Sequence, residues 1–298
     1  MSPPMVQVYP LESLFITIQY SDTAFSNITI IIVVTQAKVI NLVSRTVLVV
    51  TMSIGFQIWS SDGSSLLFSL DPTTLNEKGD PIASAQCKGI TSTGNYIYIG
   101  DGNGGITSLR LAEQFEVLSY SATSSGTGKS VGITCMHASD KLLSVGNEIG
   151  EVFCFDVSSS SPSPTTSFYE FQGTEFTATS ICCRESVVVA AFSSGHIRIF
   201  KVFPDKVSRE NELVVEIAAH SRCINALALH PTKYSFASCG EDGKLLIWDF
   251  DPTQFKINLV YSELMPHKLL TGATYLQDCK LAVSSYDRDA LDIFEPSA

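Results

Sequence analysis

Three side chains late in the sequence have the residue types of a hydrolase triad: Ser238, His220 and Asp242. In such a triad the histidine takes the proton of the serine hydroxyl, and the carboxylate orients the histidine. A nucleophilic serine needs an exposed, strained turn such as the G-x-S-x-G elbow. Ser238 instead lies between Ala237 and Cys239 in an apolar, strand-like run. The sequence therefore predicts buried structural hydrogen bonds here, and no catalytic residue.

A second segment has some of the residues of a phosphate-binding loop. Residues 126–130 (GTGKS) match the end of the G-x-x-x-x-G-K-[ST] motif, but Thr123 occupies the position of its first glycine. The motif must also lie between a buried strand and a helix, and neither pattern flanks this segment. We predict polar surface loops at residues 122–130 and 158–166, without a bound nucleotide.

Metal-binding patterns are also weak. The acidic run 287–292 is interrupted by Arg288, and strand alternation divides its carboxylates between two faces. The cysteines have no C-x-x-C spacing and the remaining histidines are isolated, so we expect reduced core cysteines and neither a metal nor a cofactor. These residues are Cys87, Cys135, Cys154, Cys182, Cys183, Cys223, Cys239, Cys279, His137, His196, His230 and His267.

The composition limits the classes of partner. Apolar residues make up 45% of the 298-residue chain and charged residues 16%, which predicts a globular protein with a large core. A net charge of −11 argues against nucleic acid, which is bound by clustered Lys and Arg. The N-terminal residues lack a signal-peptide pattern, and the most apolar run, 28–34, is too short to cross a bilayer. We predict a cytoplasmic protein that does not insert into membranes.

The elements that carry these residues form a repeat. A turn followed by alternating residues that end in a large apolar side chain occurs six times, at intervals of about 45 to 50 residues. The six segments are 55–59, 104–109, 150–155, 195–200, 243–248 and 289–294. A second strand-like segment precedes five of them, at 95–100, 141–146, 186–191, 234–238 and 280–284. Helical periodicity is almost absent. The pattern predicts an all-β fold in which four short strands make each propeller blade.

One repeat is specific enough to indicate a family. Residues 220–231 (HSRCINALALHP) and 235–249 (SFASCGEDGKLLIWD) resemble a WD repeat closely. In WD repeats the histidine bridges the aspartate and the serine, and the serine meets the indole N–H. The resemblance thus implies that His220, Ser238, Asp242 and Trp248 form a buried structural hydrogen-bond set.

Further segments are similar to the family of WD repeat-containing protein 54. They are residues 55–63, 88–100, 190–200, 220–248 and 282–287, and the resemblance covers about four-fifths of the chain. It implies a single seven-bladed β-propeller, residues 1–298, that serves as an interaction platform in the cytoplasm. The sequence departs from the family near residue 45, where one or two strands are missing. We therefore expect an atypical first blade, about residues 10–45, closed by pairing of a strand at 15–20 with the last blade, about 260–298; a truncated gene model is the alternative.

The predicted function is a non-catalytic scaffold that binds proteins or peptides through the loops at one face of the propeller. Two alternatives remain: a structural subunit of a large assembly, such as a ciliary or trafficking complex, and an enzyme or ligand-binding propeller. We expect exposed anchors at Phe192, Arg222 and Tyr286. The whole predicted face comprises Asp101, Asn147, Glu148, Phe192, Arg222, Glu241, Tyr286 and Arg288. The sequence does not predict an oligomeric state.

Overall fold

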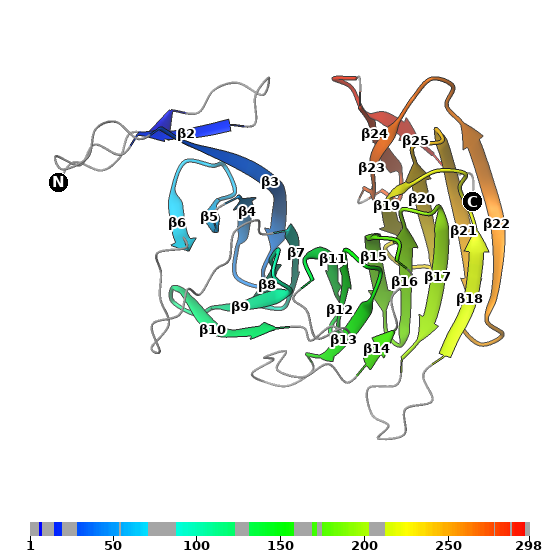
Figure 1. Ribbon diagram of the computed structural model, residues 1–298, viewed down its shortest axis with the longest axis horizontal. Coiled ribbons are helices and arrows are strands. Elements are labelled where there is room, and N and C mark those ends of the chain that lie inside the picture. The colour runs from blue at the N-terminus through cyan, green and yellow to red at the C-terminus, as the bar shows by residue number, and fades with distance from the viewer. Residues whose placement is uncertain are drawn as a thin grey trace. The chain divides into compact units, whose positions relative to one another are not determined.

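The computed structural model describes residues 6–7, 15–19, 29–53, 55–70, 88–122, 131–157, 169–171, 175–202, 212–276, 278–286 and 288–295. Every regular element in these ranges is a β-strand (Figure 1). Within them, no helix is long and apolar enough to cross a membrane. The chain divides into two compact units, residues 1–120 and 121–298, and each is described by itself. The single-domain organisation stays a prediction.

The first unit contains two sheets. A six-stranded sheet has the order β1-β2-β3-β4-β5-β6, and a four-stranded sheet has the order β10-β9-β8-β7. The strands are β1 (Val6–Gln7), β2 (Phe15–Gln19), β3 (Thr29–Asn41), β4 (Thr46–Met52), β5 (Phe56–Ser60), β6 (Leu66–Leu70), β7 (Lys88–Thr93), β8 (Tyr96–Gly100), β9 (Gly105–Leu111) and β10 (Phe115–Ala122). Alternating apolar residues such as Val47, Val49, Ile97 and Ile99 are buried in one core between the sheets.

The second unit contains three four-stranded sheets and one three-stranded sheet. Each is an antiparallel meander in which consecutive strands pair. The strands are β11 (Ile133–Ala138), β12 (Leu142–Asn147), β13 (Val152–Asp156), β14 (Tyr169–Phe171), β15 (Ala178–Arg184), β16 (Val187–Phe192), β17 (His196–Lys201), β18 (Glu212–Ala218), β19 (Ile224–Leu229), β20 (Ser235–Gly240), β21 (Lys244–Asp251), β22 (Lys256–Leu264), β23 (Leu270–Tyr275), β24 (Leu281–Ser285) and β25 (Asp292–Phe294).

The predicted repeat is confirmed. The six turn-and-strand segments form β5, β9, β13, β17, β21 and β25, and the segments that precede five of them form β8, β12, β16, β20 and β24. Each such pair is an antiparallel hairpin. The all-β prediction holds for the described residues, in which six sheets are found. A count of seven blades is compatible with these sheets and stays a prediction.

The first sheet differs from the expected closure. The strand expected to pair with the last blade is β2, and it pairs with β1 on one edge and with β3 on the other. The 13-residue strand β3 makes this possible, because its first part pairs with β2 and its second part with β4. The predicted polar loop at 158–166 and Cys87 lie outside the described residues, as does the predicted loop at 122–130 except for residue 122, which ends β10.

A β-bulge recurs in each of the six sheets. The first strand of each repeat pairs with the second strand through a one-residue register shift, which lies near the beginning of the strand in five repeats and in the middle of the 13-residue β3. The extra residues are Thr35, Gly89, Thr134, Thr179, Asn225 and Thr271. Two of them link neighbouring sheets: the hydroxyl of Thr134 donates to the carbonyl of Ala178, and Asn225 Nδ2 donates to the carbonyl of Leu270 at 2.7 Å. At these two positions the bulge aims a polar side chain at the adjacent sheet.

Candidate functional site

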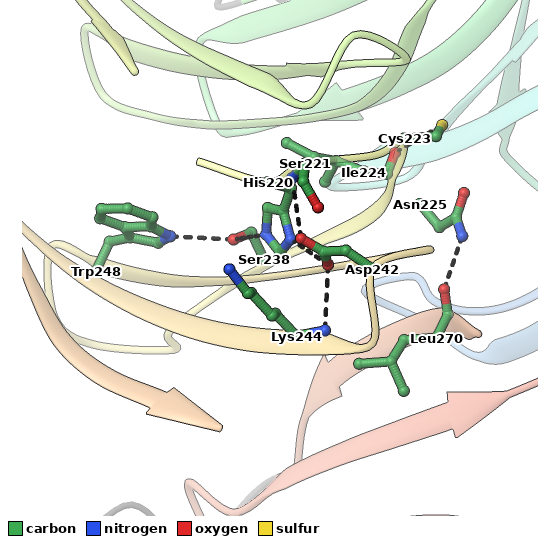
Figure 2. Close-up of polar contacts among 10 residues, drawn as sticks. All are labelled: His220, Ser221, Cys223, Ile224, Asn225, Ser238, Asp242, Lys244, Trp248 and Leu270. Carbon is green, nitrogen blue, oxygen red and sulfur yellow. Dashed lines mark hydrogen bonds and ion pairs between the residues drawn. The ribbon is translucent and has the colours of Figure 1, made fainter. Parts of the chain in front are cut away.

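The triad-like residues form a buried relay in the β19–β22 sheet. Figure 2 shows Trp248, Ser238, His220 and Asp242 in a line. Trp248 Nε1 lies 3.0 Å from Ser238 Oγ, and this hydroxyl lies 2.8 Å from His220 Nε2. His220 Nδ1 lies 2.9 Å from Asp242 Oδ1. Ser238 is fully buried, so its hydroxyl is closed to a substrate. The predicted hydrogen-bond set is therefore present in these four residues.

The chemistry of the partners fixes the direction of each hydrogen bond. Burial lowers the pKa of His220, and this outweighs the opposing effect of Asp242, so the ring is neutral. Because the Asp242 carboxylate only accepts, His220 Nδ1 carries the proton and Nε2 accepts from the Ser238 hydroxyl. Ser238 Oγ in turn accepts the indole N–H of Trp248. Every polar atom of the relay thus has a partner, and Ser238 Oγ both donates and accepts, as a satisfied buried network requires.

Asp242 also fixes the backbone on both sides of the relay. Its carboxylate accepts the N–H of Ser221 at 3.0 Å and the N–H of Lys244 at 3.1 Å. Burial would raise the pKa of Asp242, but the hydrogen bonds from His220 and these backbone groups hold it below its usual value. The relay therefore ties the β20–β21 turn to the loop that enters β19.

The relay lies beneath one end of the second unit, which we call the turn rim. The rim comprises the turns between second and third strands and the loops that enter first strands: residues 131–132, 147–151, 175–177, 192–196, 219–223, 240–244, 265–269, 286 and 288–291. Backbone hydrogen bonds join each turn to a neighbouring loop. Seven such bonds are formed, written here as N–H donor to carbonyl acceptor: Glu148 to Gly132, Glu175 to Ile149, Ser193 to Thr177, His220 to Gly195, Glu241 to Cys223, Met265 to Gly243, and Tyr286 to Leu269.

One glycine of the rim shows how closely these segments approach. Gly195 has φ +82°, a conformation that side chains disfavour, and a Cβ there would lie 2.2 Å from the carbonyl oxygen of His220. The carbonyl of Gly195 also accepts the N–H groups of Ala219 and His220. The rim is therefore a hydrogen-bonded backbone frame from which only selected side chains project.

Two residues predicted to lie on the binding face are buried caps. Asn147 is 1% exposed; its Oδ1 accepts the N–H groups of Ile149 and Glu151, and its Nδ2 donates to Glu151 Oε2 at 2.6 Å. Asp101, in the first unit, is 2% exposed and accepts the N–H groups of Asn103 and Gly105. Both side chains fold over their own turns, as Asx residues commonly do.

The prediction that Phe192 is an exposed anchor is wrong. It is 1% exposed and packs in a core with Ala178, Val152 and other residues of two adjacent sheets. Phe192 is the last residue of β16, all of whose residues are buried, and it pairs with Ala178. The guanidinium of Arg198 lies 5.5 Å from the centre of its ring. Phe192 is therefore a core residue that ends at the rim.

The other predicted residues lie on the rim of the second unit. Glu148, Arg222, Tyr286 and Arg288 are exposed, and Glu241 is half-buried. Tyr286 is 75% exposed, and its N–H bonds the carbonyl of Leu269. Among the described residues, Arg222 and Arg288 have no ion-pair partner.

Sequence reasoning missed two apolar residues of the rim. Phe176 and Leu269 are 52% and 37% exposed, respectively. Each lies one or two residues before the first strand of a sheet, β15 or β23. An apolar residue at this place in the repeat is the sequence signal that could have identified them. They add an aromatic and an aliphatic contact to the rim, and such side chains are frequent anchors of protein interfaces.

Metal and thiol chemistry has little support in the described residues. There, no group of three or more His, Cys, Asp or Glu side chains could hold a metal ion. The seven described cysteines are free, and five of them are buried. Burial raises the pKa of Cys183 to about 11 and that of Cys239 to about 12, which keeps both thiols protonated at neutral pH. The structure therefore gives the five buried cysteines the core role that the sequence predicts, whereas Cys223 and Cys279 are half-buried.

Comparison with known proteins gives the family and the fold. A family model described as WDR54 matches residues 26–295. No curated protein matches the chain in a sequence comparison. A chain from "Crystal Structure of Mitotic Checkpoint Complex" aligns with a TM-score of 0.68 and 13% identity, over 94% of this chain and 81% of that one. The β-propeller domain of Cps50 (Swd1) from Myceliophteria thermophila aligns with a TM-score of 0.65 and 11% identity, over 88% and 83%. The fold is a WD-repeat β-propeller.

Proposed function

This chain belongs to the WDR54 family, and from that premise we propose that it is a scaffold that binds other proteins or peptides through the turn rim of its second unit. WD-repeat propellers typically bind proteins, and function on such folds depends on their loops. The setting we propose is the cytoplasm, as the family resemblance implies. Nucleic acid is not proposed as a partner, because the net charge of the chain is −11.

One observation carries the proposal: the rim separates residues that hold the backbone from residues that are free to contact a partner. Asn147, Asp242 and His220 are engaged with backbone groups or with the core. Arg222 and Tyr286 project from the same frame into solvent. A rigid frame reduces the ordering cost of binding, and exposed Tyr and Arg are frequent hot spots.

We propose that this scaffold acts without catalysis. The triad-like serine supports this proposal, because Ser238 is fully buried and its hydroxyl is used at both ends by the relay. A nucleophilic serine would have to meet a substrate carbonyl.

The test is affinity capture of the tagged full-length chain from cells. We would compare the wild type with an Arg222→Glu/Tyr286→Ala variant, which changes two exposed rim residues and leaves the relay intact. The matched control is Lys233→Glu, a charge reversal at an exposed residue in the β19–β20 turn, at the other end of the sheet. We expect proteins recovered with the wild type and the control to be lost with the rim variant. Equal recovery with all three chains would reject the rim as the binding surface.

A structural subunit of a larger assembly is the second candidate. Leu291, just before β25, is 62% exposed, and Ile293, on β25, is 50% exposed. The residues at the same repeat positions of β21, Leu245 and Ile247, are 0% and 4% exposed, because the β23–β25 sheet packs on them. An obligate subunit buries such apolar surface in its complex. Light scattering of the purified chain tests this candidate, which predicts aggregation of the isolated protein; a soluble, monodisperse chain would argue against it.

A further inference from the structure

We propose that the outer edge of β22 is a self-association surface, on which two copies of this chain pair their β22 strands antiparallel, with Lys256 of one copy opposite Glu263 of the other. This surface is separate from the partner-binding side chains of the turn rim. Neither Arg222 nor Tyr286 lies on it.

The first step of the argument is that β22 is a long strand with an open edge. It has nine residues and pairs with β21 along one edge through eight residue pairs. It ends the sheet order β19-β20-β21-β22, so no described strand pairs with its other edge (Figure 1). An open edge presents unpaired N–H and C=O groups to another strand.

The second step is that β22 has charged side chains only near its two ends, at Lys256 and Glu263, and none in its middle. The fourth strand of the preceding sheet, β18, carries two glutamates in seven residues, and Glu216 is ion-paired with Arg198. In β22 the middle of the strand is uncharged, and Leu259 and Val260 are 49% and 54% exposed. Natural proteins place charges on edges to prevent pairing, so the uncharged and exposed middle of β22 leaves this edge open to pairing with a strand that brings opposite charges to its ends.

The third step concerns a bulge in β22. Tyr261 pairs with Ile247 and Leu259 pairs with Trp248, so Val260 is an extra residue outside the ladder. Because of this shift, Lys256 and Glu263 lie opposite Asp251 and Leu245, which are on one face of β21. Both charged side chains of β22 therefore lie on the same face of the sheet. Without the bulge, their odd spacing of seven would put them on opposite faces.

The fourth step is that this strand is complementary to itself. A two-fold axis perpendicular to an antiparallel pair places one residue opposite its own copy. When Val260 is left out of the count, Leu259 is the midpoint between Lys256 and Glu263. Pairing about Leu259 then puts Asn258 opposite Tyr261 and Lys256 opposite Glu263, twice by symmetry. The hydroxyl of Tyr261 donates to Glu263 Oε2 at 3.1 Å, on the face where Lys256 of the second copy would arrive.

The test is sedimentation equilibrium of the full-length chain over a concentration series. Four chains are compared: the wild type, Lys256→Glu, Glu263→Lys, and the double variant with both changes. The control is again Lys233→Glu, an exposed reversal outside β22. Circular dichroism verifies that each variant is folded, which exposed substitutions should allow.

We expect a reversible dimer for the wild type and the control. Each single reversal creates two like-charged pairs and should raise the dimer dissociation constant about tenfold, while the double variant restores opposite charges and should return it to the wild-type range. Three results would overturn the proposal: a wild-type monomer at every concentration, a dimer that the single reversals leave unchanged, or a double variant as weak as the single ones.

Discussion

Two hairpins of the second unit fold to the same shape with different polar contacts. The β20–β21 hairpin is held by the relay from Asp242 in the turn to Trp248 in the strand. The β12–β13 hairpin has Ile149 and Phe155 at those positions, and its turn is capped by Asn147, while the Thr177 hydroxyl donates to the carbonyl of Glu148. Both turns have a glycine with positive φ at the same place, Gly243 and Gly150. The backbone of the blade is therefore set by the turn glycine and the strand pattern, while the polar contacts vary.

The difference lies in how far each polar contact reaches. Asn147 bonds groups within four residues of itself. The relay joins His220, Ser238 and Trp248, which are up to 28 residues apart, and ends in the core. The Asn147 cap stabilises one turn, whereas the relay joins a turn, a loop and a core residue. Mutations in the relay should therefore lower the free energy of unfolding more than mutation of Asn147.

The largest effect is expected from Ser238→Ala. The change leaves the indole N–H of Trp248 and Nε2 of His220 without partners, which should lower the free energy of unfolding by about 2 to 3 kcal/mol. Urea unfolding measures it. The matched control is Ser144→Ala on β12, also fully buried, whose hydroxyl contacts the thiol of Cys154 at 3.9 Å and also meets the thiol of Cys183, both of which are weak hydrogen-bonding partners. Equal losses in the two variants would contradict the special role of the relay.

A smaller loss is expected from Asn147→Ala. The N–H groups of Ile149 and Glu151 lose their acceptor, and the buried Glu151 carboxylate loses a donor. We expect about 1 to 2 kcal/mol in the same unfolding experiment. Hydrogen exchange should rise in the β12–β13 turn and stay unchanged in the β20–β21 turn. A loss as large as that of Ser238→Ala would show that the local cap is equivalent to the relay.

The contribution of the relay to folding stability should also depend on pH, with an effect smaller than those of the two substitutions above. Burial lowers the pKa of His220 below its usual 6.5, so the unfolded chain binds a proton more readily than the folded chain. The stabilisation is complete above pH 6.5 and falls as the pH drops below it toward the folded pKa. Melting temperatures at pH 7.5 and 5.5 should therefore differ more for the wild type than for His220→Ala. The same pH dependence in both chains would exclude His220 as its source.

The smallest effect is expected at the second residue of each turn. Glu148 is exposed and Glu241 is half-buried, and neither carboxylate has an ion-pair partner among the described residues. Glu148→Ala and Glu241→Ala should each change the free energy of unfolding by less than about 0.5 kcal/mol. A larger change in either variant would mean that the side chain also supports its hairpin.

The sequence predicts a site residue correctly where the residue type and its spacing fit only one structural role. His220, Ser238, Asp242 and Trp248 occur together at the spacing of a WD repeat, and the structure brings them into contact. Asn147 was misassigned because a polar residue in a turn can face solvent or cap its own backbone, and sequence spacing is the same in both cases.

Phe192 was misassigned for a different reason. Its place before the turn suggested exposure, but both faces of β16 are buried against neighbouring sheets, and Phe192 packs in the core that contains Ala178. The recurring bulges were not predicted either, because one extra residue in a strand leaves the overall apolar pattern intact. The sheet at the beginning of the chain required the pairing of β2 with β1 and β3, which no local signal specifies.

The bulges have a consequence for insertions and deletions during evolution. Ile133 and Cys135 pair with the consecutive residues Asn147 and Gly146, so loss of the codon for Thr134 would leave a continuous ladder with every other pair unchanged. A codon lost two positions later would move the rest of β11 by one residue and turn its core side chains outward. The first strand of each repeat therefore has a bulge site where a single-residue length change is tolerated, and the neighbouring positions of the same strand do not share that tolerance.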